Sequence, residues 1–331
     1  MPIRVVQFGV GPIGQACVKT ILEKTELQLV GAIDIDQQKA GHDLAEICGL
    51  DESLGLTVRS DAEAALREWR PNVVVHTTTS FLDKTEEQLA TIINAGAHVV
   101  SSTEELFYPH NNSPEFCQRI DRQATEQGVA VVGTGVNPGF AMDILPLTLT
   151  GVCTRVKSIR VTRIGDASKR RLPFQLKIGA GISKKEFRQK LATGTFGHIG
   201  LRESAQMIYS TLGWKVNAVE ERIKPIIAAN KIKTKFLVVK RGQVAGIHQL
   251  LRCKTGKKVV LTLDWQMSVG AKKQYDAVQI KGAPNLTMRI DGGIFGDTGT
   301  IGSLVNTIPK ILNAKPGLRT MRDLPIPYIL M

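Results

Sequence analysis

Runs of consecutive apolar residues alternate with helix-like segments over the first 145 residues of the chain. The runs are rich in valine and isoleucine, and they lie at residues 3–8, 27–33, 72–76, 97–100 and 128–133. Strands that are mostly apolar, without a regular alternation of polar residues, are typical of a parallel sheet whose two faces are both buried. The pattern therefore predicts an α/β domain over residues 1–145, with a doubly wound parallel sheet covered by helices on both faces.

After residue 145 the pattern changes to longer strand-like segments with turn signals between them. These segments lie at residues 155–164, 235–254, 257–269 and 283–291, and helical stretches at residues 183–193 and 200–213 interrupt them. Over residues 146–295 we expect a second, α+β domain with a mixed or antiparallel sheet. Residues 298–314 are helix-like, with a kink or break expected at Pro309. We expect the segment 296–331 to return to the first domain.

Length and composition agree with two domains. The chain has 331 residues, of which 43% are hydrophobic, and single cores stop growing below this size. No apolar run reaches the roughly 18 to 20 residues that span a bilayer, and the N-terminus lacks a signal-peptide pattern, so we expect a cytoplasmic protein without a membrane partner. The five cysteines lack paired short spacing, and they predict neither disulfides nor a metal site.

Charge is distributed unevenly along the chain. Residues 1–150 contain 10 Lys and Arg against 20 Asp and Glu, whereas residues 151–331 contain 33 against 10. The basic residues are scattered among strand-like segments, without interleaved aromatic residues or a nucleic-acid-binding module. We therefore expect solvated surface and no nucleic-acid partner, with some positive field left to attract an anionic ligand.

A glycine-rich turn separates the first strand from the first helix. Its sequence is Gly9-Val10-Gly11-Pro12-Ile13-Gly14, and Asp34 follows at the end of the second strand. The glycines allow a tight turn and close approach to a pyrophosphate, which the helix N-terminus attracts. The residues Gly9, Gly11, Pro12, Ile13, Gly14 and Asp34 thus predict a Rossmann-type dinucleotide site. Asp34 favours NAD(H), because its carboxylate repels a 2′-phosphate. Residues 37–39, Gln-Gln-Lys, leave NADP(H) possible.

Polar residues follow two later strands, where a doubly wound sheet presents its loops to ligand. Thr77, Thr78 and Thr79 come after the third strand, and they are expected to contact the nicotinamide ribose, to cap the next helix, or both. Glu104 and Glu105 come after the fourth. Adjacent residues in an extended segment point to opposite sides, so one carboxylate can face the ligand as a proton-transfer group. The alternative is a helix N-terminus with acidic residues in its first turn.

The last strand of the first domain ends in residues 133–140, which contain three glycines and a proline. Such a turn lets backbone approach a flat ring, and Asn137 and Pro138 are expected beside the cofactor. The alternative is a hinge between domains.

Several segments together resemble a known enzyme family. They are GVGPIG, TEELFYP, GTGVNPGFAMDILPLTL, RVTRIGDASKRRLPFQLKIGAG, GHIGLRES and GDTGTIGSLVNTIP. The chain resembles the 2,4-diaminopentanoate dehydrogenases and the related native amine dehydrogenases, within the broader dihydrodipicolinate-reductase-like group. The resemblance extends over nearly the whole chain, and it is most specific in the NPGFAMD and RRLPFQLKIG segments.

The resemblance implies NAD(P)-dependent oxidative deamination of an amine, and the reverse reductive amination of a ketone with ammonia. It also implies a homodimer with dimer contacts in the second domain, and it places the catalytic carboxylate at Glu104. Arg163, chosen over Arg170 and Arg171, would anchor a substrate carboxylate; the alternative is a surface arginine. Phe140 would wall the pocket or pack in the core, and His198 would touch substrate or be structural. Thr300 would meet the nicotinamide or cap a helix.

Two other functions fit parts of the sequence. One is a cyclic-imine reductase of the dihydrodipicolinate reductase type, although the His-His-Lys pattern expected in its substrate loop is missing here. The other is a non-catalytic NAD-binding dimer. Neither function requires a metal, and no metal-ligand cluster is evident in the sequence.

Overall fold

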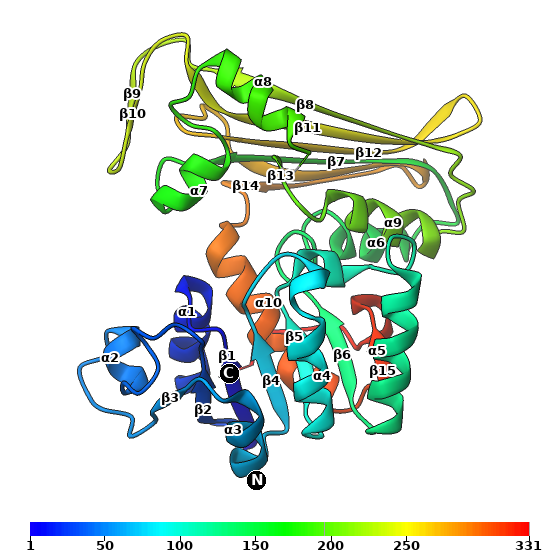
Figure 1. Cartoon of the computed structure of the whole chain (residues 1–331). Coiled ribbons are helices and arrows are strands. Elements are labelled where there is room, and N and C mark those ends of the chain that lie inside the picture. Colours follow the sequence, from blue (N-terminus) through cyan, green and yellow to red (C-terminus); the bar gives the residue numbers. More distant parts are fainter. Residues whose placement is uncertain (195, 331) are drawn as a thin grey trace. The chain divides into compact units, whose positions relative to one another are not determined.

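A computed structural model describes residues 1–194 and 196–330 of the chain (Figure 1). The chain divides into two compact units. The first contains Met1–Phe140 together with the chain from Gly296 onward, and the second contains Ala141–Phe295. The chain passes from the first unit to the second before α6 (Ile144–Thr150), rather than after residue 145 as expected. Helix α6 belongs to the second unit because it packs against strand β7 (Arg155–Asp166).

The first unit contains a parallel sheet in the order β15-β6-β5-β4-β1-β2-β3. Its strands are β1 (Ile3–Phe8), β2 (Leu27–Ile33), β3 (Val58–Arg59), β4 (Val73–His76), β5 (His98–Ser101), β6 (Ala130–Gly133) and β15 (Gly317–Arg319). Strand order reverses between β1 and β4, and doubly wound sheets bind ligands at the carboxyl edge near that point. The doubly wound parallel sheet expected from the sequence is confirmed.

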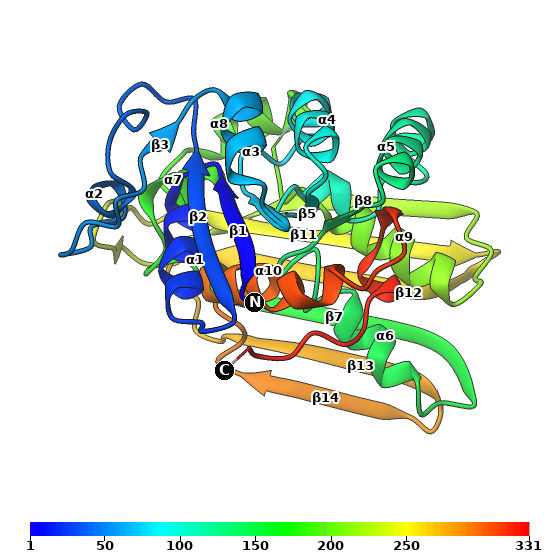
Figure 2. The ribbon, with the colours of Figure 1, turned by 90° about the horizontal axis from the view of Figure 1, so that it is seen from below.

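Helices cover both faces of this sheet (Figure 2). One face carries α1 (Pro12–Leu22) and α10 (Gly296–Ile311), which contact each other. The other face carries α3 (Ala62–Trp69), α4 (Glu86–Asn94) and α5 (Pro114–Glu126). The short helix α2 (Leu44–Cys48) contacts α1. The strands between these layers are fully buried at most positions, which explains why they read as continuous apolar runs.

The second unit contains a six-stranded sheet in the order β14-β13-β7-β12-β11-β8. Its strands are β7 (Arg155–Asp166), β8 (Ala218–Ile227), β11 (Val244–Thr255), β12 (Lys258–Ser268), β13 (Tyr275–Ala283) and β14 (Leu286–Asp291). Only the β7–β12 pair is parallel, so the sheet is mixed. This confirms the α+β second unit.

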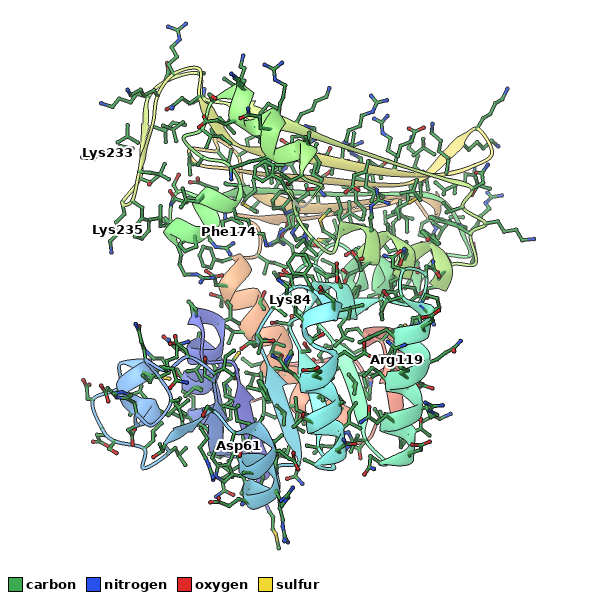
Figure 3. The ribbon with its side chains drawn as sticks, in the orientation of Figure 1. Asp61, Lys84, Arg119, Phe174, Lys233 and Lys235 are labelled. Carbon is green, nitrogen blue, oxygen red and sulfur yellow. The ribbon has the colours of Figure 1, made fainter. Side chains whose placement is uncertain are left out.

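Helices and a small hairpin accompany the second sheet. The helices are α6, α7 (Leu172–Lys177), α8 (Lys184–Ala192) and α9 (Leu201–Thr211), and α9 contacts β11 and β12. The hairpin joins β9 (Ile232–Lys233) to β10 (Val238–Val239). Its lysines Lys233 and Lys235 are exposed (Figure 3), as expected for charge on a solvated surface. Among the described residues, no helix combines the length and the apolar character that crossing a membrane requires.

Candidate active site

The turn between β1 and α1 forms an open cradle at the carboxyl edge of the first sheet. Gly9 has a φ of +87°, which favours glycine, and a Cβ on Gly14 would lie 2.0 Å from the Gly9 carbonyl oxygen. A Cβ on Gly11 would meet nothing within 4 Å, so the space in front of this residue is open. Helix α1 begins at Pro12 without a side-chain cap, which leaves its first N–H groups available to an anion. These features fit a dinucleotide pyrophosphate.

Asp34 follows β2 and is fixed beside this turn. Its Oδ2 accepts a hydrogen bond from Val10 N at 2.7 Å, and its Oδ1 accepts one from Asp36 N at 3.0 Å. Lys39 Nζ lies 2.9 Å from Asp34 Oδ2. Partial burial opposes ionisation of Asp34, but these hydrogen bonds outweigh it, so the pKa of the carboxyl is lowered. Asp34 is therefore a carboxylate at neutral pH.

The threonines after β4 form hydrogen bonds within the protein. Thr77 Oγ1 donates to the Gly9 carbonyl at 2.8 Å and accepts from Gln7 Nε2 at 2.8 Å. Thr78 Oγ1 donates to Gln88 Oε1 at 2.8 Å, and the Thr79 carbonyl accepts from Thr103 Oγ1 at 2.9 Å. The Thr77 hydroxyl thus joins β4 to the glycine-rich turn. Its role in holding that turn was not foreseen from the sequence.

The two adjacent glutamates have different surroundings. Glu105 Oε2 accepts a hydrogen bond from Leu82 N at 2.8 Å, so Glu105 caps the 3₁₀ helix η1 (Leu82–Lys84). Glu104 begins a second 3₁₀ helix, η2 (Glu104–Phe107), directly beyond the carboxyl end of β5, and it is half-buried. This hydrogen bond gives Glu105 a structural role, and the assignment of proton transfer to Glu104 stays a prediction.

Close packing against β6 holds η2 in place. A Cβ on Gly133, the last residue of β6, would lie 2.6 Å from the Leu106 carbonyl carbon and 2.7 Å from Phe107 N. Real Cβ atoms essentially never come this close to backbone, so only glycine lets η2 pack here. Gly133 thereby fixes the backbone that carries Glu104.

The turn after β6 contacts the N-terminal part of α10. Val136 N donates to Thr300 Oγ1 at 3.4 Å, so Thr300 contacts this turn. Thr134 is buried, and its Oγ1 has no hydrogen-bond partner among the described residues. Asn137 and Phe140 are half-buried in the same turn, and Pro138 is buried. Four segments of the first unit therefore end at one edge of the sheet: the glycine-rich turn, the threonines, η2 and this turn.

The second unit contains a cluster of polar residues on one face of its sheet. Arg163 on β7 donates to Asp276 Oδ2 at 2.9 Å and to the Ile294 carbonyl at 2.6 Å. It is 5% exposed, so it is not the surface arginine that the sequence left open. Burial lowers the pKa of Arg163 despite Asp276, and it raises the pKa of Asp276 despite Arg163. Asp276 thus offsets much of the Arg163 charge.

His198 lies beside Arg163 on this face. Its ring stacks on Trp265, with centroids 4.8 Å apart, and Trp265 pairs with Arg163 across β12 and β7. Its backbone N donates to Gln249 Oε1 at 2.8 Å. Burial, and then the positive charges of Lys177 and Arg163, lower the His198 pKa to about 3. The neutral ring has its Nε2 enclosed without a hydrogen-bond partner among the described residues.

Arg170 is a further buried cation in the second unit, and it lies between two rings. Its guanidinium carbon is 3.9 Å from the ring centroid of Phe174 and 5.2 Å from that of Phe295.

The sequence did not predict that Trp265, Gln249 and Asp276 are neighbours of Arg163 and His198. The polar and aromatic residues that interrupt the apolar strand at residues 261–268 could have indicated this polar cluster from the sequence.

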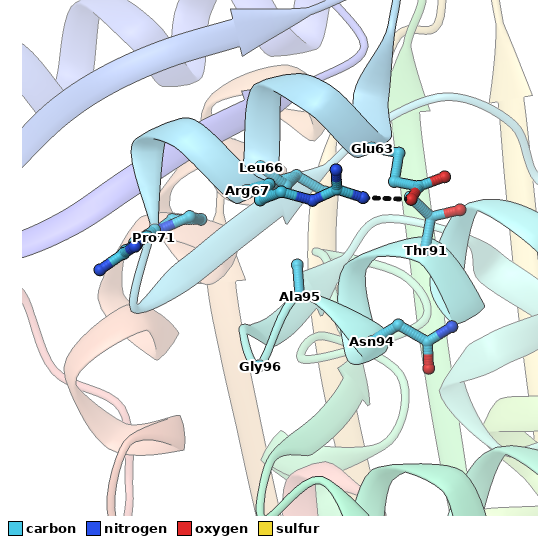
Figure 4. Close-up of a pocket in the computed structure, with 9 residues that line it drawn as sticks. Glu63, Leu66, Arg67, Pro71, Thr91, Asn94, Ala95 and Gly96 are labelled. Carbon is cyan, nitrogen blue, oxygen red and sulfur yellow. Dashed lines mark hydrogen bonds and ion pairs between the residues drawn. The ribbon is translucent and has the colours of Figure 1, made fainter.

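A groove between α3 and α4 is separate from these residues (Figure 4). It has a volume of about 630 Å³, and the ion pair between Glu63 and Arg67 lies in its wall. Its floor includes Pro71 and Gly96, which precede β4 and β5. The groove therefore lies at the amino ends of strands, opposite the edge that carries Glu104. No group of three or more His, Cys, Asp or Glu within residues 1–194 and 196–330 is placed to hold a metal ion.

Comparisons with known proteins agree with this arrangement. A family model described as 2,4-diaminopentanoate dehydrogenase C-terminal domain matches residues 140–331, and one described as dihydrodipicolinate reductase, N-terminus, matches residues 3–112. The chain is 32% identical to the 2,4-diaminopentanoate dehydrogenase of Acetoanaerobium sticklandii, over 99% of this chain and 95% of that protein.

Two further relatives are amine dehydrogenases. The chain is 26% identical to one from Streptomyces virginiae, over 98% of this chain and 96% of that protein. A solved structure of amine dehydrogenase from Mycobacterium smegmatis superposes with a TM-score of 0.88 at 26% identity, covering 99% of this chain and 98% of that chain. These likenesses extend over both units of the fold.

Proposed function

Because the chain belongs to the 2,4-diaminopentanoate dehydrogenase family, we propose that it catalyses NAD(P)-dependent oxidative deamination of 2,4-diaminopentanoate or a simple amine. The reverse reaction is the reductive amination of a ketone with ammonia. The enzyme is thus an oxidoreductase acting on CH–NH₂ groups. The observation that carries the proposal is the position of Glu104 at the carboxyl end of β5, in the sheet that carries the dinucleotide cradle.

Glu104 serves as the proton-transfer group of this reaction. In the direction of deamination, a nicotinamide cofactor held at the glycine-rich turn would supply the acceptor for the hydride of the carbon that bears the amine. Water then adds to the resulting iminium carbon, and Glu104 as a carboxylate takes a proton from that water. As a carboxylic acid, Glu104 returns the proton to the amine nitrogen, which leaves as ammonia, and the carboxylate then takes the hydroxyl proton as the ketone forms. In the reverse direction the same carboxyl protonates the departing hydroxyl of the carbinolamine.

The remaining site residues bind and orient the reactants. Asp34 accepts hydrogen bonds from the adenosine ribose, and the glycine-rich turn with Pro12 and Ile13 receives the pyrophosphate. Thr77, Thr78 and Thr79, with the 137–138 turn and Thr300, surround the nicotinamide half. We assign NAD(H) as the preferred cofactor, with NADP(H) also accepted.

Substrate contacts fall to Phe140, Arg163 and His198. Arg163 retains N–H donors beyond the two that Asp276 and the Ile294 carbonyl accept. It can therefore orient a carboxylate by hydrogen bonds even though Asp276 offsets its charge. The enclosed Nε2 of neutral His198 offers one further hydrogen bond to substrate. The enzyme acts as a cytoplasmic homodimer, with dimer contacts in the second unit.

Glu104→Gln tests the proposal, with Glu105→Gln as the matched neighbour. NADH formation is followed with 2,4-diaminopentanoate and with simple alkylamines, and NADH binding is followed by fluorescence. Glu104→Gln should abolish turnover while NADH still binds. Glu105→Gln should lose much less, because an amide oxygen can still accept the hydrogen bond from Leu82 N. Wild-type turnover by Glu104→Gln would remove this residue from the mechanism.

A second candidate is reduction of a cyclic imine, which the match of residues 3–112 to the dihydrodipicolinate reductase N-terminus favours. That match covers only the first unit, whereas the diaminopentanoate family model covers the second. Oxidation of NADH or NADPH by a cyclic imine, with no reaction from ketones plus ammonia, would select this alternative.

A further inference from the structure

The loop after β2 returns a lysine onto Asp34. Asp36 O accepts hydrogen bonds from the backbone N of Lys39 and of Ala40, both at 2.9 Å, and Asp36 Oδ1 accepts one from Gln38 N at 3.0 Å. This turn brings Lys39 Nζ to 2.9 Å from Asp34 Oδ2 and to 3.3 Å from Asp36 Oδ2. The Lys39 ammonium is therefore paired with two carboxylates, those of Asp34 and Asp36.

The carboxylate that Lys39 contacts is the one that would read the adenosine ribose. Asp34 Oδ2 also accepts from Val10 N, inside the glycine-rich turn, so the ion pair lies directly at the cradle. An unpaired carboxylate here would repel a 2′-phosphate, which carries about two negative charges. The ammonium of Lys39 offsets the charge of Asp34, and this weakens the repulsion.

Lys39 is also able to move. Its side chain is 23% exposed, against 12% for Asp34, and a lysine ammonium lies on a flexible four-carbon stem. Asp34 is fixed by two backbone N–H groups, so it keeps its orientation if the lysine leaves. The fixed Asp34 carboxylate can thus bind a ribose with a free 2′-hydroxyl, and the mobile Lys39 ammonium can bind a ribose with a 2′-phosphate.

We propose that Lys39 sets the choice between NAD(H) and NADP(H): it stays on Asp34 when the ribose 2′-hydroxyl is free, and it turns to the phosphate when the 2′-position is phosphorylated. This inference rests on the cofactor site of the proposed function. Lys39 is partly exposed, which weakens its interaction with any one charge, but the 2′-phosphate carries about two negative charges, so we expect an effect of about 10-fold on affinity.

The test measures binding separately from turnover. Dissociation constants of NADH and NADPH are obtained by fluorescence titration, and those of 5′-AMP and adenosine 2′,5′-bisphosphate by calorimetry. In Lys39→Met, NADPH and the bisphosphate should bind about 10-fold more weakly, whereas NADH and 5′-AMP should change by less than about 3-fold. Lys39→Arg should keep NADPH binding, and added salt should weaken NADPH more in wild type than in Lys39→Met.

Lys19→Met is the matched control. Lys19 is an exposed lysine in the last turn of α1, so the variant removes the same charge from the same unit, away from the cradle. It should leave both cofactors unchanged. A Lys39→Met protein whose ratio of NADPH to NADH affinity equals that of wild type would overturn the role of Lys39 alone. Wild-type protein that binds neither cofactor would overturn the inference together with the proposed cofactor site.

Discussion

Gly133→Ala should displace the carboxylate of Glu104, the proposed proton-transfer group, without touching it. The added Cβ would lie 2.6 Å from the Leu106 carbonyl carbon and 2.7 Å from Phe107 N. Both atoms are backbone, so no side chain can rotate away to relieve the contact. An ordinary contact begins at 3.4 Å, so η2 must move by about 0.8 Å relative to β6, a displacement of the size that costs catalysis about 100-fold.

The expected loss of activity can be distinguished from a loss of folded protein. Overpacking of this kind destabilises a protein by about 1 to 3 kcal/mol, which leaves most of the protein folded. We expect kcat/KM for amine oxidation to fall about 100-fold, while NADH binding changes little because the glycine-rich turn follows β1, which β4 separates from β5. The assay is steady-state NADH formation, normalised to the cofactor-binding sites counted by NADH titration.

Gly302→Ala is the control for a glycine-to-alanine change in the same unit. Its Cβ would meet only Asn306 Nδ2, at 3.9 Å, and alanine in a helix interior is favoured over glycine by about 0.5 to 1 kcal/mol. This variant should keep wild-type turnover and be slightly more stable. If Gly133→Ala also turned over at the wild-type rate, then the location of η2 would not govern the reaction, and the assignment of Glu104 would lose its geometric basis.

Two further predictions concern buried titratable groups. Burial lowers the pKa of His76 to about 4, although a hydrogen bond to Gln88 opposes this shift. Below about pH 6.5 the native protein therefore binds fewer protons than the unfolded protein. The free energy of unfolding should fall by up to about 3 kcal/mol as the pH drops from about 6.5 to 4. Urea unfolding of wild type and His76→Gln across this window checks it, since the variant should lose that slope. Asp276→Ala should leave Arg163 buried without its carboxylate and cost about 3 to 5 kcal/mol, whereas Arg67→Ala, at an exposed ion pair with Glu63, should cost less than about 1 kcal/mol in thermal unfolding.

The first unit could be predicted from the sequence because its signals are local. The mostly apolar runs 3–8 and 27–33 coincide with β1 and β2, since strands buried on both faces have few polar positions. One strand of this sheet, β15, is only three residues long and is hard to predict from the sequence.

In the second unit, β8 is also hard to predict, because it contains four charged residues and a proline. Residues 235–254, expected as one strand, contain β10, a turn and β11, because Gly242 takes a positive φ there.

The site could be predicted only where residues close in sequence act together. The glycine-rich turn, Asp34 and the TEEL segment each lie at the end of a strand, so their location follows from the strand pattern. Asp276 joins Arg163 across 113 residues, through the register of β13 on β7. Glu105 accepts a hydrogen bond from Leu82, a residue 23 positions away. Such pairings depend on the tertiary fold and leave no periodic signal in the chain.

The insertion of the second unit within the first has a consequence for biosynthesis. Helix α10 covers β4, β5 and β6, and its Leu304, Val305, Ile308 and Ile311 are fully buried. These residues leave the ribosome only after the whole second unit has been made. The nascent sheet of the first unit must therefore wait with β4, β5 and β6 uncovered on one apolar face while the contiguous second unit folds. Stalled or truncated translation products ending before Gly296 should consequently depend on chaperones, although they already contain every strand of the sheet except β15.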